Sequence, residues 1–356
     1  MNKVFEGLKV IELAAVLAGP AVGLFFAELG ATVIKVENKK TGGDVTRSWR
    51  LPSEEAEAPV SAYYCAINWN KQVMFLDLSQ EADRQQVYEL VKTADVVLAN
   101  FKAGGAAALQ MDYNTLKQYN EQLIYGSING FGAESERVAF DVVLQAESGF
   151  MYMNGAPDGP PTKMPVALID ILAAHQLKQG ILVALLERYK TGKGGHVTVS
   201  LLEAAVAALA NQATNWLMAG HIPQRMGSLH PNIAPYGELF TSKDQKQLVV
   251  AIGSNRQFQH LCSCLDCPEL AVDSLYQSNV LRVKNRTILA QNLKAAFALQ
   301  AAAPLLERCH AQHVPIGLVR DMKAVWEQPD LQGMILEEDI EGQATKRVRT
   351  AVFKLI

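Results

Sequence analysis

Asp170 is the side chain in this sequence with the clearest chemical potential. It is a single carboxylate inside the apolar run that begins at Pro165, and a helical pattern follows it over Ile171–Arg188. A carboxylate in apolar surroundings is costly to desolvate unless a neighbour compensates it. One interpretation is an N-cap that accepts hydrogen bonds from first-turn amides, which spacing alone favours. The other is a carboxylate held at a helix N-terminus beside a pocket, where it serves as a nucleophile.

A glycine-containing turn near the N-terminus is the second candidate for chemistry. Gly19-Pro20 and Gly23 follow a predicted strand and open a predicted helix, where the phosphate-binding turn of a dinucleotide site would lie. Glu37 also supplies an acidic residue at the end of the next predicted strand. The glycine spacing nevertheless differs from the G-x-G-x-x-G fingerprint, so a nicotinamide site is disfavoured. Pro20 suits the first position of a helix.

The cysteine pattern Cys262-x-Cys264-x-x-Cys267, with His260 nearby and Cys309-His310 later, raises the question of a zinc site. Zinc sites usually carry paired C-x₂₋₄-C units at a defined separation, which this chain lacks. Buried apolar thiols are therefore favoured, and no metal site is predicted.

Two further polar positions have commoner explanations than catalysis. Arg47 lies in a loop after the second predicted strand and could bind phosphate, but a solvated surface arginine is the more frequent role. No G-x-S-x-G nucleophile elbow occurs, and Ser148 has no adjacent pattern of a general base.

The elements that must position these residues alternate between short β-branched runs and helical patterns over the first 130 residues. Strands are predicted at Leu8–Leu13, Ala31–Glu37, Val73–Leu78, Asp95–Asn100 and Gln122–Asn129, and helices at Pro20–Leu29, Ser79–Thr93 and Ala106–Gln118. This order predicts a largely parallel sheet covered on both faces, the doubly wound α/β class. In that class ligands bind beyond the carboxyl ends of the strands. Asn100-Phe101-Lys102 and Asn129-Gly130-Phe131-Gly132 lie at two such ends.

The rest of the chain predicts a second, smaller domain. After the helix that follows Asp170, we expect a strand at His196–Val199, a helix at Leu201–Leu217, a linker or active-site loop at Gly220–Pro235, a strand at Gln247–Ile252 and helices up to Gln312. A chain of 356 residues is longer than one compact core usually needs. We therefore expect a large Rossmann-like domain at 1–220, completed by 320–356, and a smaller α/β domain at 221–319.

The bulk composition bounds the partners and the compartment. With 49% hydrophobic and 19% charged residues, wholesale disorder is excluded, and a net charge of -3 argues against nucleic-acid and anionic-membrane surfaces. Lys9 and Glu12 break the N-terminal apolar stretch, and no apolar run reaches membrane-spanning length. Five cysteines without regular spacing favour a reducing environment. We expect a soluble, unprocessed, cytoplasmic protein with no nucleic-acid or membrane partner.

Four blocks of sequence together resemble the class III coenzyme A transferases, the family that includes formyl-CoA and carnitine CoA-transferases and α-methylacyl-CoA racemases. In chain order the blocks are Leu8–Pro20 with Leu29–Glu37 and Gly43–Arg47; Asn68–Lys71 with Leu76–Leu78, Ala94–Val97 and Asn100-Phe101; Ser127–Gly132 with Phe140-Asp141 and Gln145–Gly149; and Pro157–Pro161 with Asp170 and Gly180–Gly194. The likeness continues more loosely through His230–Tyr236 and Pro315–Gly317. It covers nearly the whole chain, and the order and spacing of the blocks are what make it specific.

The resemblance implies that Asp170 matches the family's catalytic aspartate. In the transferases this carboxylate attacks the donor thioester, which gives a mixed anhydride and CoA thiolate. The thiolate then attacks the aspartyl carbonyl to give an enzyme–CoA thioester, and the acceptor carboxylate completes the transfer. Exchange between carboxylates preserves the energy of the thioester. An apolar surround keeps water away from the intermediates.

The resemblance also implies an interlocked homodimer and a site for CoA or acyl-CoA, which binds as a substrate rather than as a permanent cofactor. The implied contacts are Val16, Ala18, Asn38, Arg47, Leu76, Asn100, Phe101, Lys102, Phe140 and Asp141. Relatives often carry a basic residue at the position of Asn38. Here the candidates for the 3′-phosphate of CoA are Lys39, Lys40, Arg47 and Lys102.

Two departures from the family pattern bear on the reaction. Racemases carry a histidine before the residue that matches Asp141, whereas this chain has Phe140, and a racemase needs a base on each face of the α-carbon. The glycine run of formyl- and oxalyl-CoA transferases is reduced here to Met226-Gly227-Ser228, which argues against oxalate-type substrates. We therefore expect an acyl-CoA:carboxylate CoA-transferase acting through Asp170. The alternatives are an acyl-CoA racemase or isomerase and a catalytically inactive CoA-binding relative. The sequence leaves the donor and acceptor acids open.

Overall fold

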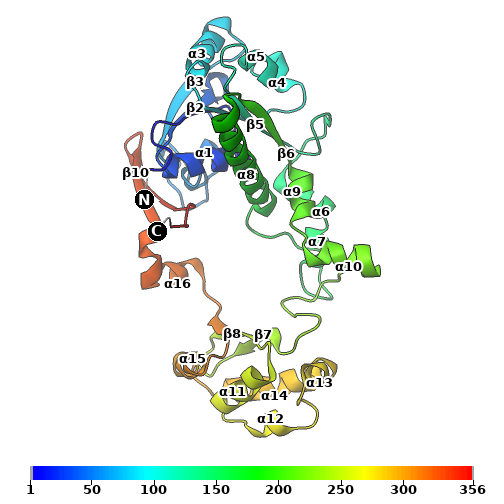
Figure 1. The fold of residues 1–356 in the computed structure, drawn as a ribbon. Helices are drawn as coiled ribbons and strands as arrows, with labels where there is room; N and C mark the ends of the chain where they lie inside the picture. Colours follow the sequence, from blue (N-terminus) through cyan, green and yellow to red (C-terminus); the bar gives the residue numbers. More distant parts are fainter. Residues whose placement is uncertain (1–2, 355–356) are drawn as a thin grey trace. The chain divides into compact units, whose positions relative to one another are not determined.

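The computed structural model describes residues 3–354 and divides them into two compact units (Figure 1). The first unit contains the described residues up to Met151, Lys163–Pro223 and the described residues from Gln332 onward. The second unit contains Tyr152–Thr162 and Gln224–Leu331. The segment Tyr152–Thr162 thus groups with the second unit, whereas the sequence analysis placed it inside a large domain spanning 1–220. The C-terminal boundary likewise lies at Leu331 rather than at residue 319.

A six-stranded sheet forms the centre of the first unit, in the order β3-β2-β1-β4-β5-β6. Its strands are β1 (Lys9–Glu12), β2 (Thr32–Asn38), β3 (Lys71–Leu76), β4 (Val96–Ala99), β5 (Ile124–Asn129) and β6 (Gly195–Ser200). Every neighbouring pair is parallel. The strand order reverses between β1 and β4, which is where ligands bind in doubly wound sheets. The predicted doubly wound α/β class is confirmed.

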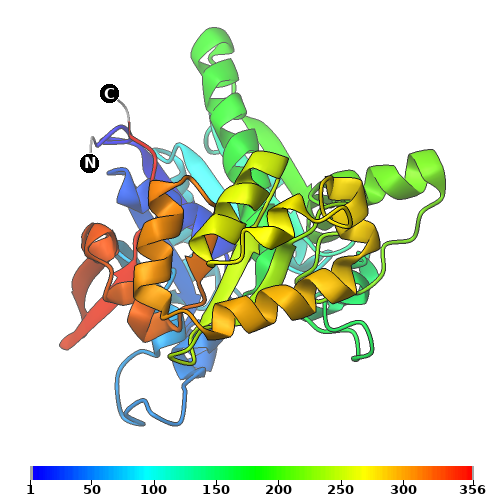
Figure 2. The same cartoon turned by 90° about the horizontal axis from the view of Figure 1, so that it is seen from below.

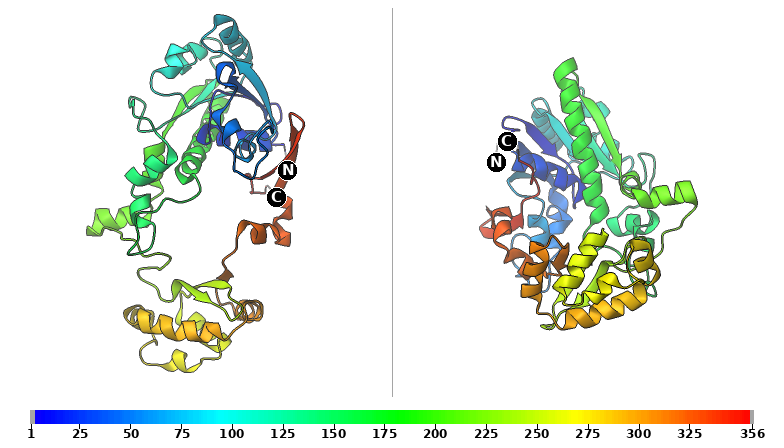
Figure 3. Two further views of the ribbon diagram at one scale, coloured as in Figure 1. Left: turned by 180° about the vertical axis from the view of Figure 1, so that it is seen from behind. Right: turned by 60° about the horizontal axis from the view of Figure 1, so that its bottom comes forward.

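Helices cover both faces of this sheet (Figures 1 and 3). The helices and 3₁₀ turns of the first unit are α1 (Ala18–Glu28), η1 (Lys39–Thr41), η2 (Val45–Ser48), α2 (Ala62–Cys65), α3 (Glu81–Val91), α4 (Gly105–Ala108), α5 (Tyr113–Leu116), α6 (Asp141–Glu147), α8 (Leu168–Thr191), α9 (Leu201–Ala207) and α10 (Asn211–Ala219), and α7 (Phe150–Met153) lies at the boundary. Val10 of β1 packs in a core with residues of α1, α8 and α9, whereas its neighbour Ile11 packs with residues of α3 and α5. This alternation explains why consecutive residues of the central strands, such as Val10-Ile11 of β1 and Val96–Ala99 of β4, are apolar.

Two predicted helices are broken in the structure. The helix expected at Ala106–Gln118 is two short helices, α4 and α5, and the helix expected at Leu201–Leu217 is α9 followed by α10. Gln110 and Ala210 have φ angles of +56° and +49°, which a continuing right-handed helix excludes. Asp112 then starts α5 by accepting hydrogen bonds from two first-turn amides. The apolar periodicity runs through both breaks, so periodicity alone predicted one helix in each case.

α8 is long and apolar enough to cross a membrane, and no other described helix is. It packs against α1, α6 and α9 and against strands β5 and β6. Ile169, Ala173, Leu177 and Ile181 form its buried side. A helix at the core of a globular fold meets the same length and composition test, so this finding is weak evidence for a membrane span.

The second unit consists of a three-stranded antiparallel sheet and helices (Figure 2). Its elements are β7 (Tyr236–Thr241), β8 (Gln247–Ala251), α11 (Asn255–Cys264), α12 (Glu269–Val272), α13 (Asn279–Lys284), α14 (Arg286–Ala298), α15 (Ala302–Ala311), β9 (Ile316–Leu318) and α16 (Met322–Trp326), with η3 (Pro329–Met334) at the boundary. Phe240 and Phe297 stack in its core with their rings parallel, at a centroid distance of 4.4 Å.

The C-terminal part of the first unit is a hairpin of β10 (Ile335–Ile340) and β11 (Gln343–Val348). The hairpin forms its own sheet and does not extend the six-stranded one. Arg347 of β11 makes a buried ion pair with Glu28 at the end of α1. Glu28 also accepts hydrogen bonds from the amides of Thr350 and Ala351. One carboxylate therefore ties the end of the described chain to α1.

Candidate active site

Asp170 is the third residue of α8, and its backbone is already helical. The N-cap position belongs to Ala167, which makes no capping bond with its side chain. The interpretation of Asp170 as the N-cap is therefore wrong, because the helix begins at Leu168, three residues earlier than the sequence pattern indicated. Within residues 3–354, no hydrogen bond or ion pair engages the carboxylate oxygens of Asp170. The carboxylate is half-buried at the positive end of a 24-residue helix, which favours its anionic form.

Asp141 performs the capping that was expected of Asp170. Its Oδ1 accepts a hydrogen bond from the Ile169 amide at 2.7 Å and a longer one from the Asp170 amide at 3.4 Å. Its Oδ2 accepts from Gln145 Nε2 at 2.5 Å, and Gln145 is fully buried. Gln145 Oε1 in turn accepts from the amide of Met164 at 2.8 Å. α6 thereby fixes both the segment that leads into α8 and the position of Asp170.

The charge state of Asp170 is finely balanced. Burial, together with the nearby negative charge of Asp141, raises the pKa of Asp170 to about 7. A buried carboxylate resists ionisation because its anion loses solvation, and a second carboxylate adds repulsion. Near neutral pH the group is therefore divided between an anion able to attack a carbonyl and a protonated acid. Strongly shifted pKa values of this kind concentrate at functional sites.

Tyr63, on α2, is a site residue that the sequence analysis missed. Burial raises the pKa of its phenol, and the negative charges of Asp170, Asp141 and Asp44 raise it further. Three separate carboxylates therefore lie within electrostatic reach of one hydroxyl group. Trp49 packs against Tyr63 edge to face at a centroid distance of 5.1 Å. Tyr63 and Tyr64 lie shortly before the Asn68–Lys71 block. Nothing in the local sequence pattern distinguishes Tyr63 from Tyr64.

The turn between β1 and α1 holds two of the predicted CoA contacts, Val16 and Ala18. Val16 has a φ angle of +71°, a conformation that costs a β-branched residue about 1–3 kcal/mol. Asn100, which follows β4, accepts a hydrogen bond from the Ala15 amide at 2.9 Å and donates one to the Ala15 carbonyl at 2.7 Å. The side chain of Asn100 is thus occupied in shaping the turn. Ala18 is buried at the start of α1.

The remaining predicted CoA contacts lie at the carboxyl edge of the sheet. Asn38 and Leu76 end β2 and β3 and are register partners, and the side chain of Asn38 caps η1 by accepting from the Lys40 amide. Phe101 and Lys102 follow β4, with Phe101 half-buried and Lys102 exposed.

The four cations considered for the 3′-phosphate differ in availability. Lys40 pairs with Asp77 at 3.0 Å. Among residues 3–354, Lys39 and Lys102 make no ion pair, so they are the more available of the three lysines.

Arg47 is the predicted residue whose surroundings differ most from expectation. Its Nε lies 2.6 Å from Glu37 Oε2, and its two terminal nitrogens donate to Tyr64 Oη at 2.9 Å and Glu341 Oε1 at 3.1 Å. The side chain is buried, so the interpretation as a solvated surface arginine is wrong. Its donors are committed within the protein, which also leaves a CoA-phosphate contact without support. Glu37 is equally occupied and buried, which argues further against a nicotinamide site.

Phe140 precedes Asp141 and is 54% exposed, so it offers an apolar face where racemases carry a histidine. This aromatic ring has no proton to exchange with a substrate. Base chemistry from this position is therefore excluded.

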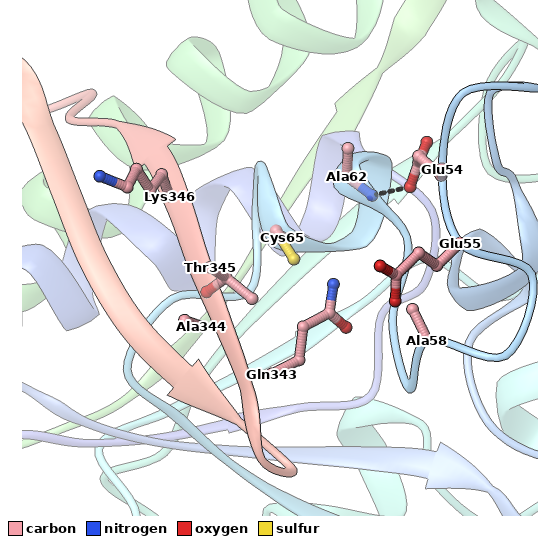
Figure 4. A pocket seen from close by; sticks show the side chains of 9 residues that line it. All are labelled: Glu54, Glu55, Ala58, Ala62, Cys65, Gln343, Ala344, Thr345 and Lys346. Atoms are coloured by element: carbon pink, nitrogen blue, oxygen red, sulfur yellow. Dashed lines mark hydrogen bonds between the residues drawn. The ribbon is translucent and has the colours of Figure 1, made fainter.

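The first unit also contains a cavity of about 260 Å³ (Figure 4). It is lined by Glu54, Glu55, Ala58, Ala62, Cys65, Gln343, Ala344, Thr345 and Lys346. Glu54 is tied to the Ala62 amide by a hydrogen bond of 2.7 Å, and burial raises the pKa of the Cys65 thiol. None of the predicted site residues lines this cavity, and its thiol is held in the unreactive protonated form.

The cysteines of the second unit are buried free thiols, as the sequence favoured: Cys262, Cys264, Cys267 and Cys309. Across residues 3–354, no group of three or more histidine, cysteine or acidic side chains is arranged to hold a metal ion.

The fold and this constellation define an α/β enzyme with a positioned aspartate at a helix N-terminus. The chain belongs to the CoA-transferase family III, whose family model matches residues 5–355. A succinate–glutarate CoA-transferase of Agrobacterium fabrum (strain C58) is 38% identical, over 98% of this chain and 88% of the relative. The succinyl-CoA:glutarate CoA-transferase of Homo sapiens is 34% identical, over 94% of this chain and 76% of the relative. The chain is therefore an enzyme, a class III CoA-transferase, and the predicted family is confirmed.

A solved structure agrees with this assignment. The crystal structure of a CAIB/BAIF family protein from Brucella suis matches with a TM-score of 0.88 and 38% sequence identity, over 99% of this chain and 93% of that chain. The agreement extends through both units of the fold.

Proposed function

We propose that this enzyme moves CoA between carboxylic acids through covalent intermediates on Asp170. The observation that carries the proposal is the unpaired, half-buried carboxylate of Asp170, held in the first turn of α8 by Asp141. A nucleophile must have a free electron pair at a fixed position, and this carboxylate has both. The pKa of about 7 keeps a usable fraction ionised at neutral pH.

In the first half-reaction, a carboxylate oxygen of Asp170 attacks the thioester carbonyl of the acyl-CoA donor. The carbon–sulfur bond breaks, and CoA leaves as the thiolate while an aspartyl–acyl anhydride forms. The thiolate then attacks the aspartyl carbonyl carbon, which releases the donor acid as a carboxylate. The product is a thioester between Asp170 and CoA, and no proton is gained or lost.

In the second half-reaction, the acceptor carboxylate attacks the carbonyl carbon of the Asp170 thioester. CoA thiolate leaves again, and a second anhydride forms. Attack of the thiolate on the acceptor's carbonyl carbon gives the new acyl-CoA and restores the carboxylate of Asp170. Every intermediate is susceptible to hydrolysis, so the apolar neighbours of Asp170, such as Ile169 and Ala173, serve to limit water.

Trapping the intermediate tests this mechanism. The enzyme is incubated with succinyl-CoA and treated with borohydride, which reduces an aspartyl thioester to an alcohol, and peptide mass spectrometry then locates the change. We expect it at Asp170 in the wild type and nowhere in Asp170→Asn. Hydroxylamine offers an independent trap, because it converts the thioester to a hydroxamate. A wild-type enzyme that transfers CoA without any Asp170 adduct would contradict the proposal.

We propose small dicarboxylates as the acids. Support comes from the two relatives described above, which are a succinate–glutarate CoA-transferase and a succinyl-CoA:glutarate CoA-transferase. Matched acceptors separate recognition of the second carboxylate from chain length: glutarate is compared with valerate, and succinate with butyrate. We expect each dicarboxylate to exceed its monocarboxylate in kcat/KM by at least about tenfold, the usual effect of one charge-assisted contact.

A racemase remains the alternative reaction for this fold, but Phe140 disfavours it because it supplies no base opposite Asp170. For CoA binding we propose the carboxyl edge of the sheet, with the β1–α1 turn and Asn38, Leu76, Phe101 and Lys102. For the 3′-phosphate we propose Lys39 or Lys102, since both ammonium groups are available.

We also propose a homodimer. Three large side chains of α8 are exposed to solvent: Val183 by 67%, Leu186 by 57% and Tyr189 by 90%. Leu217 and Met218 on α10 are exposed by 77% and 82%. Large exposed apolar side chains on helices of one unit are typical of an interface.

A further inference from the structure

A buried cluster of four charged side chains lies against the β1–α1 turn. Lys35 Nζ lies 2.9 Å from Glu12 Oε1 and 3.0 Å from Asp44 Oδ2, and Lys71 Nζ lies 2.8 Å from Glu12 Oε2. None of the four side chains is more than 1% exposed. Two side chains of basic residues and two of acidic residues thus pair with one another away from bulk water.

Stability alone gives a poor reason for this cluster, because apolar replacements of buried ion pairs are often neutral or stabilising. The cluster does, however, bond the backbone of the turn. Lys35 Nζ donates to the Ala14 carbonyl at 2.9 Å, and Asp44 Oδ2 accepts from the Val16 amide at 3.2 Å. The Lys35 ammonium therefore uses its three protons on Glu12, Asp44 and the turn.

The turn so held has a shape that its own sequence does not favour. Val16 lies in the left-handed region, which β-branched residues rarely adopt. A Cβ on Gly19 would lie 2.3 Å from Ala14 Cβ, and a Cβ on Gly23 would lie 1.9 Å from Glu12 Oε2. α1 thus approaches the turn and the cluster as closely as glycine permits. The surroundings, rather than local preference, determine the conformation of the turn.

We propose that Lys35 and Asp44 are positioning residues that preset the β1–α1 turn for coenzyme A. They act through the backbone of Ala14 and Val16 and touch no substrate. This inference rests on the proposed function, which places the coenzyme at this turn. A preset turn removes the ordering cost that binding would otherwise meet. Loss of the cluster therefore weakens the binding of every CoA thioester by a similar factor and leaves the acceptor acid unaffected.

Asp44→Asn tests the proposal, because it removes the charge and keeps the shape. We expect KM for the acyl-CoA donor and Kd for free CoA, measured by calorimetry, to rise at least about tenfold. The KM for the acceptor acid and kcat should stay within about threefold of the wild type. Lys35→Met, which removes the anchor on Ala14, should shift the same two constants.

The matched control is Glu28→Gln. It breaks the buried Glu28–Arg347 pair in the same unit and on the adjoining helix α1, without a bond to the turn. Its melting temperature should fall while KM for acyl-CoA stays at the wild-type value. If Asp44→Asn does not fold, Thr46→Val provides a milder loss, because the Thr46 hydroxyl donates to Asp44 Oδ1 at 2.8 Å. It should raise the acyl-CoA KM in the same direction, by a smaller factor.

The outcomes separate the two proposals. Equal rises in both KM values, or a fall in kcat alone, would show a general structural role and overturn the inference. Unchanged acyl-CoA constants in folded Asp44→Asn, Lys35→Met or Thr46→Val would overturn it as well. A wild-type enzyme that binds no CoA would instead overturn the proposed function at this turn.

Discussion

The carboxylate of Asp141 closes the N-terminus of the helix that carries Asp170. Its Oδ1 accepts from the Ile169 amide at 2.7 Å and lies 3.4 Å from the Asp170 amide nitrogen. One anion thus fixes the position of another. Burial and this neighbouring charge together raise the pKa of Asp170 to about 7. Asp141 therefore influences both where the proposed nucleophile lies and how readily it ionises.

The pH dependence of the first half-reaction follows from this pKa. The ionised form of Asp170 attacks the thioester, so kcat/KM for acyl-CoA should rise with pH and level off above the pKa. With a pKa of about 7, roughly a tenth of the group is ionised at pH 6 and roughly nine tenths at pH 8. We expect an increase of about tenfold between these two values. A flat profile over this range would show that ionisation of Asp170 does not control the reaction.

Asp141→Asn should move this profile to lower pH. The amide oxygen still caps α8, but the repulsion that disfavours the Asp170 anion is lost. We expect the acidic limb to shift down by about half a unit to one unit, with kcat on the plateau reduced less than about fivefold. Asp141→Ala also removes the cap and should cost about 1 kcal/mol of stability, measured by urea unfolding.

The control for Asp141→Asn is Gln145→Met. Gln145 donates to Asp141 Oδ2 at 2.5 Å, so the methionine variant loses that contact and keeps the charge. Its acidic limb should stay at the wild-type pH. A shift in both variants would assign the effect to lost packing rather than to the charge of Asp141.

Asp170→Asn should abolish transfer and stabilise the fold. The pKa of Asp170 is raised from 3.8 to about 7 in the folded state, so between these values the folded protein holds a proton that the unfolded chain releases. Wild-type stability therefore falls as pH rises through this window. The variant should be more stable by about 1–2 kcal/mol at pH 8, after allowance for the partial exposure of the side chain, and by almost nothing at pH 4. Urea unfolding at the two pH values measures the difference.

Much of the fold could be predicted from the sequence, because periodicity directly reports burial. The six strands of the large sheet were expected within about two residues of their observed ends. The breaks at Gln110 and Ala210 could not be predicted, since the apolar spacing continues across them. The grouping of Tyr152–Thr162 with the second unit was also missed, because it depends on tertiary contacts.

The candidate site was predictable only where one residue carries the chemistry. Asp170 stood out as a charge in an apolar run. Lys35 shares that feature, since it lies in the middle of β2 between apolar residues, but the sequence analysis did not single it out. The role of Arg47 depends on partners distant in sequence, above all Tyr64 and Glu341, so a local pattern could not reveal it.

Arg47 should matter for folding rather than for CoA binding. Arg47→Met leaves Glu37 buried without its charge partner, which typically costs about 3–5 kcal/mol. The double variant Arg47→Met, Glu37→Gln removes both charges and should recover at least about half of that loss. The KM for acyl-CoA in the double variant should stay within about threefold of the wild type. A large rise in that KM with restored stability would instead assign Arg47 to the CoA phosphates.

The proposed homodimer makes α8 sensitive to surface charge. Leu186 and Tyr189 are exposed by 57% and 90%, and a glutamate at either position would have to be desolvated in an interface. We expect the double variant Leu186→Glu, Tyr189→Glu to weaken association at least about 30-fold, measured by sedimentation equilibrium. Val272→Glu, at a residue of the second unit that is 75% exposed, is the matched control and should leave association unchanged. A monomeric wild type would refute the dimer, whereas a double variant that still dimerises would place the interface away from α8.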